Sequence, residues 1–228
     1  PPSDAALPLH VVEQNKYKDW LQQQPVFVAD WVKANGFTGA CGQALLIPGS
    51  DGKPDMALAG YGTPAQRARR RFVLAGAAGK LPKGVYSIAS GLDQEALDTE
   101  CLGWLLSSYR FGRYHDQGNM AAELVAPEDV DSAAIESLAA AECLTRDLIN
   151  TPASDMGPEE LQAAAETLAT AHGAQIEVTA DAALLDANLP LIHTVGRASD
   201  RRPRLIDMRW GNTGPLLTLV GKSVSSDT

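Results

Sequence analysis

The stretch QALLIPGSDGKPDMALAGYG (residues 43–62) sets the first expectation for the fold. It contains two short apolar runs, residues 43–48 and residues 55–62, and each has the length of a β-strand. The segment SDGKP between them holds Asp51 and Gly52, and an Asp-Gly pair is a strong signal for a tight turn between antiparallel strands. The stretch therefore predicts a β-hairpin.

Helical patterns lie on both sides of this hairpin. Residues 17–31 carry aromatic residues and valines at helical spacing, and Pro25 divides them into two short helices. Residues 64–78 and 94–114 are also predicted to be helical, whereas residues 84–89 are expected to form a strand. Because strands and helices alternate, the first half is predicted to be an α/β domain.

A long alanine-rich helix is predicted for residues 128–150. It is expected to end before Pro152, because the residue that precedes a proline is disfavoured in the helical region. We place the domain boundary at the start of this helix. The prediction is a small N-terminal α/β domain at residues 1–127, joined by the long helix to a second domain at residues 128–228.

The second half also alternates between helices and strands. Helices are predicted for residues 158–172 and 181–187, and strands for residues 174–180, 205–210 and 216–220. An α/β layer of this size usually continues for several more strands. We therefore expect the second domain to be an incomplete α/β/α domain.

Composition and charge limit the possible partners. Hydrophobic residues make up 45% of the 228 residues and charged residues 21%, which is typical of a packed globular protein. The formal net charge of −9 repels phosphate backbones and anionic lipid, so nucleic acid is not expected as a partner. One basic cluster could bind an anion, but we interpret it as the solvated face of a helix; it consists of Arg67, Arg69, Arg70 and Arg71.

The cysteines and the N-terminal residues indicate a cytoplasmic protein. Cys41, Cys101 and Cys143 lie far apart, and an odd number of cysteines cannot form a complete disulfide framework. The first residues, PPSDAALPLH, lack the basic and apolar segments of an export signal. No window approaches the ~20 apolar residues that a membrane span requires, so no membrane partner is expected.

Few motifs in the sequence indicate catalysis directly. Gly221, Lys222 and Ser223 follow an apolar run, as at the end of a phosphate-binding loop, but that motif needs a glycine where Leu216 stands. No paired histidines for a metal and no G-x-S-x-G nucleophile motif are present.

Lys222 and Asp227 form the one remaining candidate pair. Beyond a predicted strand, both side chains could point into a crevice at the carboxyl edge of a sheet, where ligands of α/β proteins bind. A carboxylate is a good ligand for a divalent metal, and a lysine amine binds a metal when it is deprotonated. The alternative is an ordinary surface loop.

Three ordered stretches resemble the leucyl aminopeptidase, or cytosol aminopeptidase, family of metallopeptidases. They are RDLINTPASDMGPEEL (residues 146–161), PLIHTVGRASDRRPRLIDMRWG (residues 190–211) and LLTLVGK (residues 216–222). The resemblance implies a hydrolase that releases N-terminal amino acids from peptides, using two divalent metal ions, zinc or manganese, in a cytoplasmic hexamer. By position, Lys222 and Asp227 match two ligands of the metal pair.

The same resemblance limits what this chain is expected to do alone. The remaining carboxylate ligands, the catalytic lysine and the catalytic arginine of the family match positions past Thr228, so no catalytic residue is expected within the chain. Ser223 and Ser226 replace the glycine and phenylalanine of the family motif. We therefore expect that the metal pair is not retained and that the chain alone is inactive. The alternative is a non-catalytic binding or assembly module derived from this family.

Overall fold

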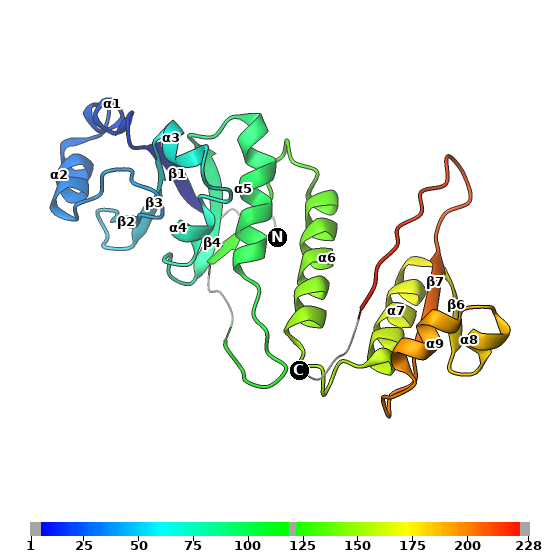
Figure 1. The fold of residues 1–228 in the computed structure, drawn as a ribbon. Helices are drawn as coiled ribbons and strands as arrows, with labels where there is room; N and C mark the ends of the chain where they lie inside the picture. Colours follow the sequence, from blue (N-terminus) through cyan, green and yellow to red (C-terminus); the bar gives the residue numbers. More distant parts are fainter. Residues whose placement is uncertain (1–5, 119–121, 224–228) are drawn as a thin grey trace. The chain divides into compact units, whose positions relative to one another are not determined.

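The computed structural model describes residues 6–118 and 122–223 (Figure 1). Two compact units, Pro1–Thr145 and Arg146–Thr228, make up the chain, and each combines helices with strands. The prediction of two α/β parts is therefore confirmed. In the described ranges, no helix is both long enough and apolar enough to cross a membrane.

A five-stranded sheet forms the centre of the first unit. Its strands are β1 (Leu7–Glu13), β2 (Ala44–Pro48), β3 (Pro54–Gly62), β4 (Gly84–Ser90) and β5 (Ala122–Leu124). They are arranged in the order β2-β3-β1-β4-β5. β2 and β3 pair in the antiparallel sense, as the hairpin prediction required, while β1 lies parallel to both β3 and β4. The central strand, β1, was not predicted from the sequence pattern.

Helices cover both faces of this sheet (Figure 1). The helices of the first unit are α1 (Tyr17–Gln22), α2 (Val26–Ala34), α3 (Pro64–Arg67), α4 (Ala75–Ala78) and α5 (Gln94–Ser107), and α6 (Ser132–Asn150) runs across the unit boundary. On one face, Val12 and Leu58 pack with Val28 and Val32 of α2. On the other face, Leu9 packs in one cluster with residues of α4 and α5. Alternating side chains of the strands therefore supply two separate cores.

The prediction of one helix at residues 64–78 is wrong, because two short helices, α3 and α4, form there. Between them Phe72 adopts a left-handed backbone conformation with φ of 59°. The Phe72 side chain lies so close to Gly103 of α5 that a β-carbon on Gly103 would be 2.5 Å from that of Phe72. This tertiary contact favours a break in the helix over the local helical pattern.

Glu100 of α5 also stabilises the break between α3 and α4. Its side chain is buried, with 3% of the residue exposed, and its carboxylate accepts hydrogen bonds from the backbone N–H groups of Val73 at 3.2 Å and Leu74 at 2.8 Å. Burial and the neighbouring Glu100 carboxylate raise the pKa of Tyr61 above its ordinary value. A buried carboxylate thus ties α5 to the segment between α3 and α4.

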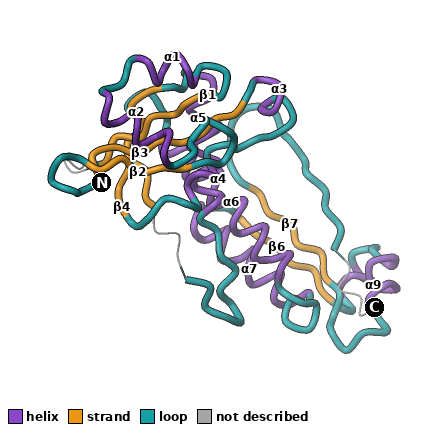
Figure 2. Tube along the Cα trace, turned by 90° about the vertical axis from the view of Figure 1, so that its left-hand side faces the viewer, coloured by secondary structure: helices purple, strands orange, loops and turns teal. Residues whose placement is uncertain are grey.

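The second unit contains a smaller sheet and three helices. In chain order its elements are α7 (Pro158–His172), β6 (Gln175–Ala180), α8 (Ala183–Asp186), α9 (Pro190–Gly196) and β7 (Arg204–Arg209). β6 and β7 pair in the antiparallel sense and appear as a two-stranded ribbon in Figure 2. α7 begins and ends as predicted, with Pro158 in its first turn and Gly173 in the left-handed conformation that closes a helix.

The strand predicted at residues 216–220 does not form. These residues have no helical or strand structure, and Leu216 and Val220 are 93% and 92% exposed. A strand needs a neighbour that pairs with its backbone N–H and C=O groups. Within the described part of the second unit, β6 and β7 pair only with each other, so the apolar run has no partner.

Replacing Glu100 by alanine is expected to destabilise the first unit. Loss of the carboxylate leaves two buried backbone N–H groups without acceptors, so the free energy of unfolding is expected to fall by about 2–4 kcal/mol. Urea denaturation followed by circular dichroism measures this change. The control Asp98→Ala alters an exposed position of the same helix and is expected to change stability by less than about 0.5 kcal/mol. Equal effects of the two changes would contradict the role given to Glu100.

Candidate functional site

Lys222, the described member of the predicted metal pair, lies exposed at the edge of a cavity in the second unit. The cavity has a volume of about 470 Å³. It is lined by Pro158, Leu161, Leu191, Ile192, Val195, Gly196, Ser199, Arg201, Pro203, Arg204, Leu205, Ile206, Gly221, Lys222 and Ser223. The segment that carries Lys222 therefore runs past α7, α9 and β7, the elements that form the rest of the lining.

Asp227 lies outside the described residues, so its pairing with Lys222 stays a prediction. The same holds for Ser226. Within residues 6–118 and 122–223, no three histidine, cysteine, aspartate or glutamate residues are grouped closely enough to hold a metal ion. Over the same ranges, no ion pair involves Lys222.

Apolar side chains from two helices and a strand line much of this cavity. Leu161 comes from α7, Leu191 and Val195 come from successive turns of α9, and Leu205 comes from β7. The end of α9 can pack against the turn before β7 because residue 196 is glycine. A β-carbon on Gly196 would lie 2.4 Å from the ring of Pro203. The result is an apolar hollow with polar groups at its edge, which suits an apolar group of a ligand.

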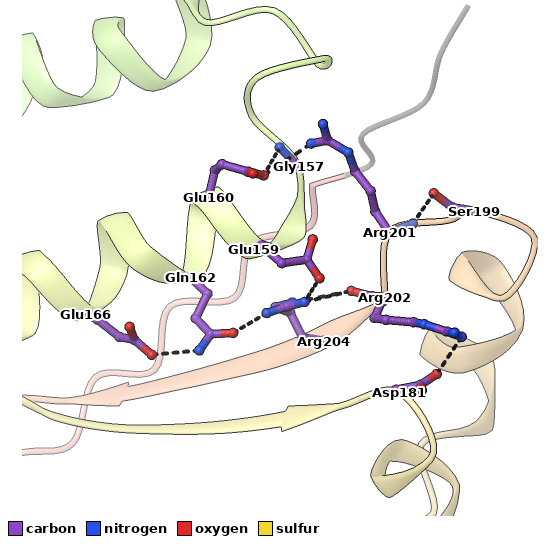
Figure 3. A network of polar contacts seen from close by, with 10 residues as sticks. All are labelled: Gly157, Glu159, Glu160, Gln162, Glu166, Asp181, Ser199, Arg201, Arg202 and Arg204. Atoms are coloured by element: carbon purple, nitrogen blue, oxygen red, sulfur yellow. Dashed lines mark hydrogen bonds and ion pairs between the residues drawn. The ribbon is translucent and has the colours of Figure 1, made fainter.

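Arg201, on the connection between α9 and β7, and Arg204, at the start of β7, bind the first turns of α7 (Figure 3). The Arg204 guanidinium donates hydrogen bonds to the side chains of Glu159 and Gln162, and Gln162 in turn donates to Glu166 at 2.6 Å. The side chain of Arg204 is only 11% exposed. This network fixes the position of β7 relative to α7, and with it two walls of the cavity.

A second arginine completes the connection at the start of the helix. Arg201 donates to Glu160 at 3.2 Å and to the backbone carbonyl of Ser154. The backbone N–H groups of Glu160 itself and of Gly157 hold the pKa of the Glu160 carboxyl below its ordinary value. The charges of Arg201 and Arg204 are thus balanced by α7. In the described part of the lining, Lys222 is the cation without an ion pair.

Comparison with known families identifies the relationship of this chain. Residues 7–127 match the family model of the M17 aminopeptidase N-terminal domain, and residues 143–228 match that of the catalytic domain of the cytosol aminopeptidase family. The chain belongs to the cytosol aminopeptidase family. The resemblance inferred from the three ordered stretches of sequence is therefore confirmed, and this family consists of hydrolases that act on peptides.

Individual family members agree with this assignment. The probable cytosol aminopeptidase of Rhodococcus jostii (strain RHA1) is 30% identical over 223 residues, covering 87% of this chain and 44% of the relative. The crystal structure of the cytosol aminopeptidase from Coxiella burnetii superposes with a TM-score of 0.84 at 31% identity, covering 93% of this chain and 46% of that one. The chain thus spans less than half the length of these family members.

A more distant structure shares the fold alone. The bottromycin maturation enzyme BotP, solved in complex with Mn, superposes with a TM-score of 0.70 at 24% identity. The match covers 90% of this chain and 45% of BotP. The fold of most of this chain therefore also occurs in BotP, whose structure was solved with manganese.

The arginine network of the second unit was not predicted from the sequence. Its signal was present as two charge clusters, Glu159 and Glu160 at the start of α7 and the RRPR segment at residues 201–204. Opposite charges far apart in sequence do not by themselves identify which side chains meet, because exposed pairs contribute little and form in many arrangements. In the basic cluster, Arg69, Arg70 and Arg71 are exposed as expected, although they follow α3 and do not belong to it. Arg67 differs from them, because it is ion-paired with Glu13 and its side chain is 22% exposed.

Replacing Arg204 by alanine is expected to loosen the second unit. The change removes the bonds to Glu159 and Gln162 and the packing of a nearly buried side chain, so the opening free energy of the β6 and β7 amides is expected to fall by about 1–3 kcal/mol. Hydrogen exchange of these amides measures the effect. Arg202→Ala is the matched control, because the Arg202 side chain is 63% exposed and, among the described residues, bonds only to Asp181, at 3.5 Å. A larger effect for Arg202→Ala would contradict the network described here.

Proposed function

We propose that the chain contributes its two units to a leucyl aminopeptidase-type metallopeptidase, which releases N-terminal amino acids from peptides at a site with two divalent metal ions. The observation that carries this proposal is the ordered match of both family domains along one chain. Manganese or zinc is the proposed metal, and the manganese complex of BotP supports manganese. A cytoplasmic location and a hexameric assembly are proposed with it, and the name given to the relatives supports the location.

Lys222 and Asp227 are the proposed metal ligands of this chain. The exposure of Lys222 and the absence of an ion partner for it in the described residues support this role, since its amine is available to a metal. A neighbouring dication favours the neutral form of an amine, which supplies the lone pair for coordination.

The residues present do not fit a metal pair by themselves. Two divalent ions need more donors than one amine and one carboxylate, because each ion takes at least about four ligands. The described residues add no further group of three or more potential ligands. We therefore propose that a polypeptide of these 228 residues alone is inactive, and no catalytic step is assigned to its side chains.

The domain boundary is proposed to lie at residue 127, with α6 leading into the catalytic domain. The N-terminal family match ends at residue 127 and supports this position. The catalytic match begins at residue 143, and the two compact units divide between Thr145 and Arg146. All of these positions lie within or next to α6 (Ser132–Asn150). In this proposal the helix belongs to the second domain, although residues 132–145 of it fall in the first compact unit.

Hydrolysis of leucine p-nitroanilide tests the proposed function. With Mn²⁺ or Zn²⁺ added, the 228-residue polypeptide is expected to give no turnover above buffer. A protein of the full length of the family that contains these 228 residues is expected to hydrolyse the substrate, and a chelator is expected to abolish this activity. In that protein Lys222→Ala is expected to lower kcat/KM at least about 100-fold, because a metal ligand is lost.

Lys53→Ala is the matched control for Lys222→Ala. Lys53 is exposed in the turn between β2 and β3, and its replacement is expected to leave kcat/KM unchanged. Turnover by 228-residue material of verified mass and purity would overturn the proposal that the chain alone is inactive. An inactive complete protein that still folds would favour the alternative of a binding or assembly module.

A further inference from the structure

The first unit contains a cavity of about 540 Å³ at the carboxyl end of its central strands. β1 ends at Glu13, β3 at Gly62 and β4 at Ser90, and these three strands run parallel. The lining includes Glu13 and Lys16 after β1, Tyr61 near the end of β3, and residues 90–93 after β4. The volume lies within the range of small-molecule sites, which is roughly 300–1,000 Å³.

The position of this cavity is one at which open α/β sheets bind ligands. β1 and β4 are adjacent and parallel, yet the segments that follow them lie on opposite faces of the sheet. After β1, α1 packs on the face formed by Val12 and Leu58. After β4, α5 places Trp104 in the core of the other face. The strand order thus reverses between β1 and β4, and a crevice forms outside their carboxyl ends.

The wall on the β3 side of the cavity is held in place by Arg67. Its guanidinium donates to the Glu13 carboxylate at 2.9 Å and to the backbone carbonyls of Tyr61 at 3.3 Å and Gly62 at 3.1 Å. The guanidinium carbon also lies 4.5 Å from the centre of the Tyr61 ring. Lys16 reaches the same carboxylate at 2.5 Å. Three of the five Arg67 donors are therefore directed at protein acceptors, and the exposed Lys16 ammonium, with one such bond, keeps donors free for a ligand.

Two aspartates give the remaining surface of the cavity its charge. Asp19 belongs to α1, and Asp93 caps α5 by accepting the N–H of Ala96 at 2.9 Å. In the described ranges, neither has an ion-pair partner. The Asp93 carboxylate and Glu95 in the first turn already balance the positive end of the α5 dipole, which disfavours a phosphate there. Among the charged groups of the lining, the two aspartate carboxylates and the Lys16 ammonium are thus the most available to a ligand.

We propose that this cavity binds a basic amino acid such as lysine. Its two ammonium groups would be held by Asp19 and Asp93, and its carboxylate would lie next to Lys16. The ligand carries two positive charges and one negative charge, which complements the available groups. The site lies wholly in the first unit, so the proposal goes beyond the peptidase activity proposed above and does not depend on it.

Titration calorimetry of the 228-residue protein with L-lysine tests this proposal. L-Lysine is expected to bind, and two analogues are expected to bind about 10-fold more weakly, because each lacks one charge-assisted contact. L-Norleucine lacks the side-chain ammonium, and cadaverine lacks the carboxylate. No detectable binding of L-lysine, or binding of adenosine monophosphate at least as tight, would overturn the proposal.

Variants locate the binding site. Asp19→Asn and Asp93→Asn are each expected to weaken L-lysine binding about 10-fold, and asparagine preserves the cap of α5 because it is as good an N-cap as aspartate. Asp98→Asn, on the exposed side of α5 and outside the cavity lining, is the matched control and is expected to have no effect.

Lys16→Ala is expected to weaken binding of L-lysine but not of cadaverine. Equal affinities for all four variants would show that lysine binds elsewhere and would refute the site.

Discussion

β1 is paired along both of its edges, with β3 on one side and β4 on the other, and the first unit is organised around this constraint. A strand in that position must contribute side chains to both faces of the sheet. Leu9 and Val11 enter one core and Val12 enters the other. The same strand ends at Glu13, where Arg67 ties it to the end of β3. Pairing of β1 thus fixes the two cores and the cavity at the carboxyl edge together.

The sequence predicted those helices and strands whose ends are set by residues at the ends themselves. The β2–β3 hairpin follows from its Asp-Gly turn, and α7 follows from Pro158 and Gly173. β1 was not predicted because its strand character comes from pairing with residues some 50 to 80 positions away. The break between α3 and α4 depends on Glu100, which no local pattern indicates. The arginine network around Arg204 was missed for the same reason, and of the predicted site only Lys222 could be placed.

The two units are stabilised by different interactions. Of the buried hydrophobic residues in the described part of the chain, all but Ala169 and Leu184 lie in the first unit. The second unit instead relies on ion pairs and hydrogen bonds between α7 and the connection to β7, and it exposes large apolar side chains such as Trp210 and Leu217. Exposed apolar side chains of this size are typical of surfaces that bind other molecules.

The two cavities differ in how firmly packed neighbours hold the residues that line them. The cavity beside β1 lies at the carboxyl edge of a five-stranded sheet with a core on each face, and all of its lining residues belong to the first unit. The cavity beside Lys222 is bounded on one side by residues 221–223, which belong to no helix or strand. A metal site requires ligands held to within a fraction of an ångström by packed neighbours. Lys222 lacks such packing in this unit, whereas Glu13, Arg67 and Asp93 already hold fixed positions. The site proposed for a small charged ligand therefore draws all of its residues from the packed first unit.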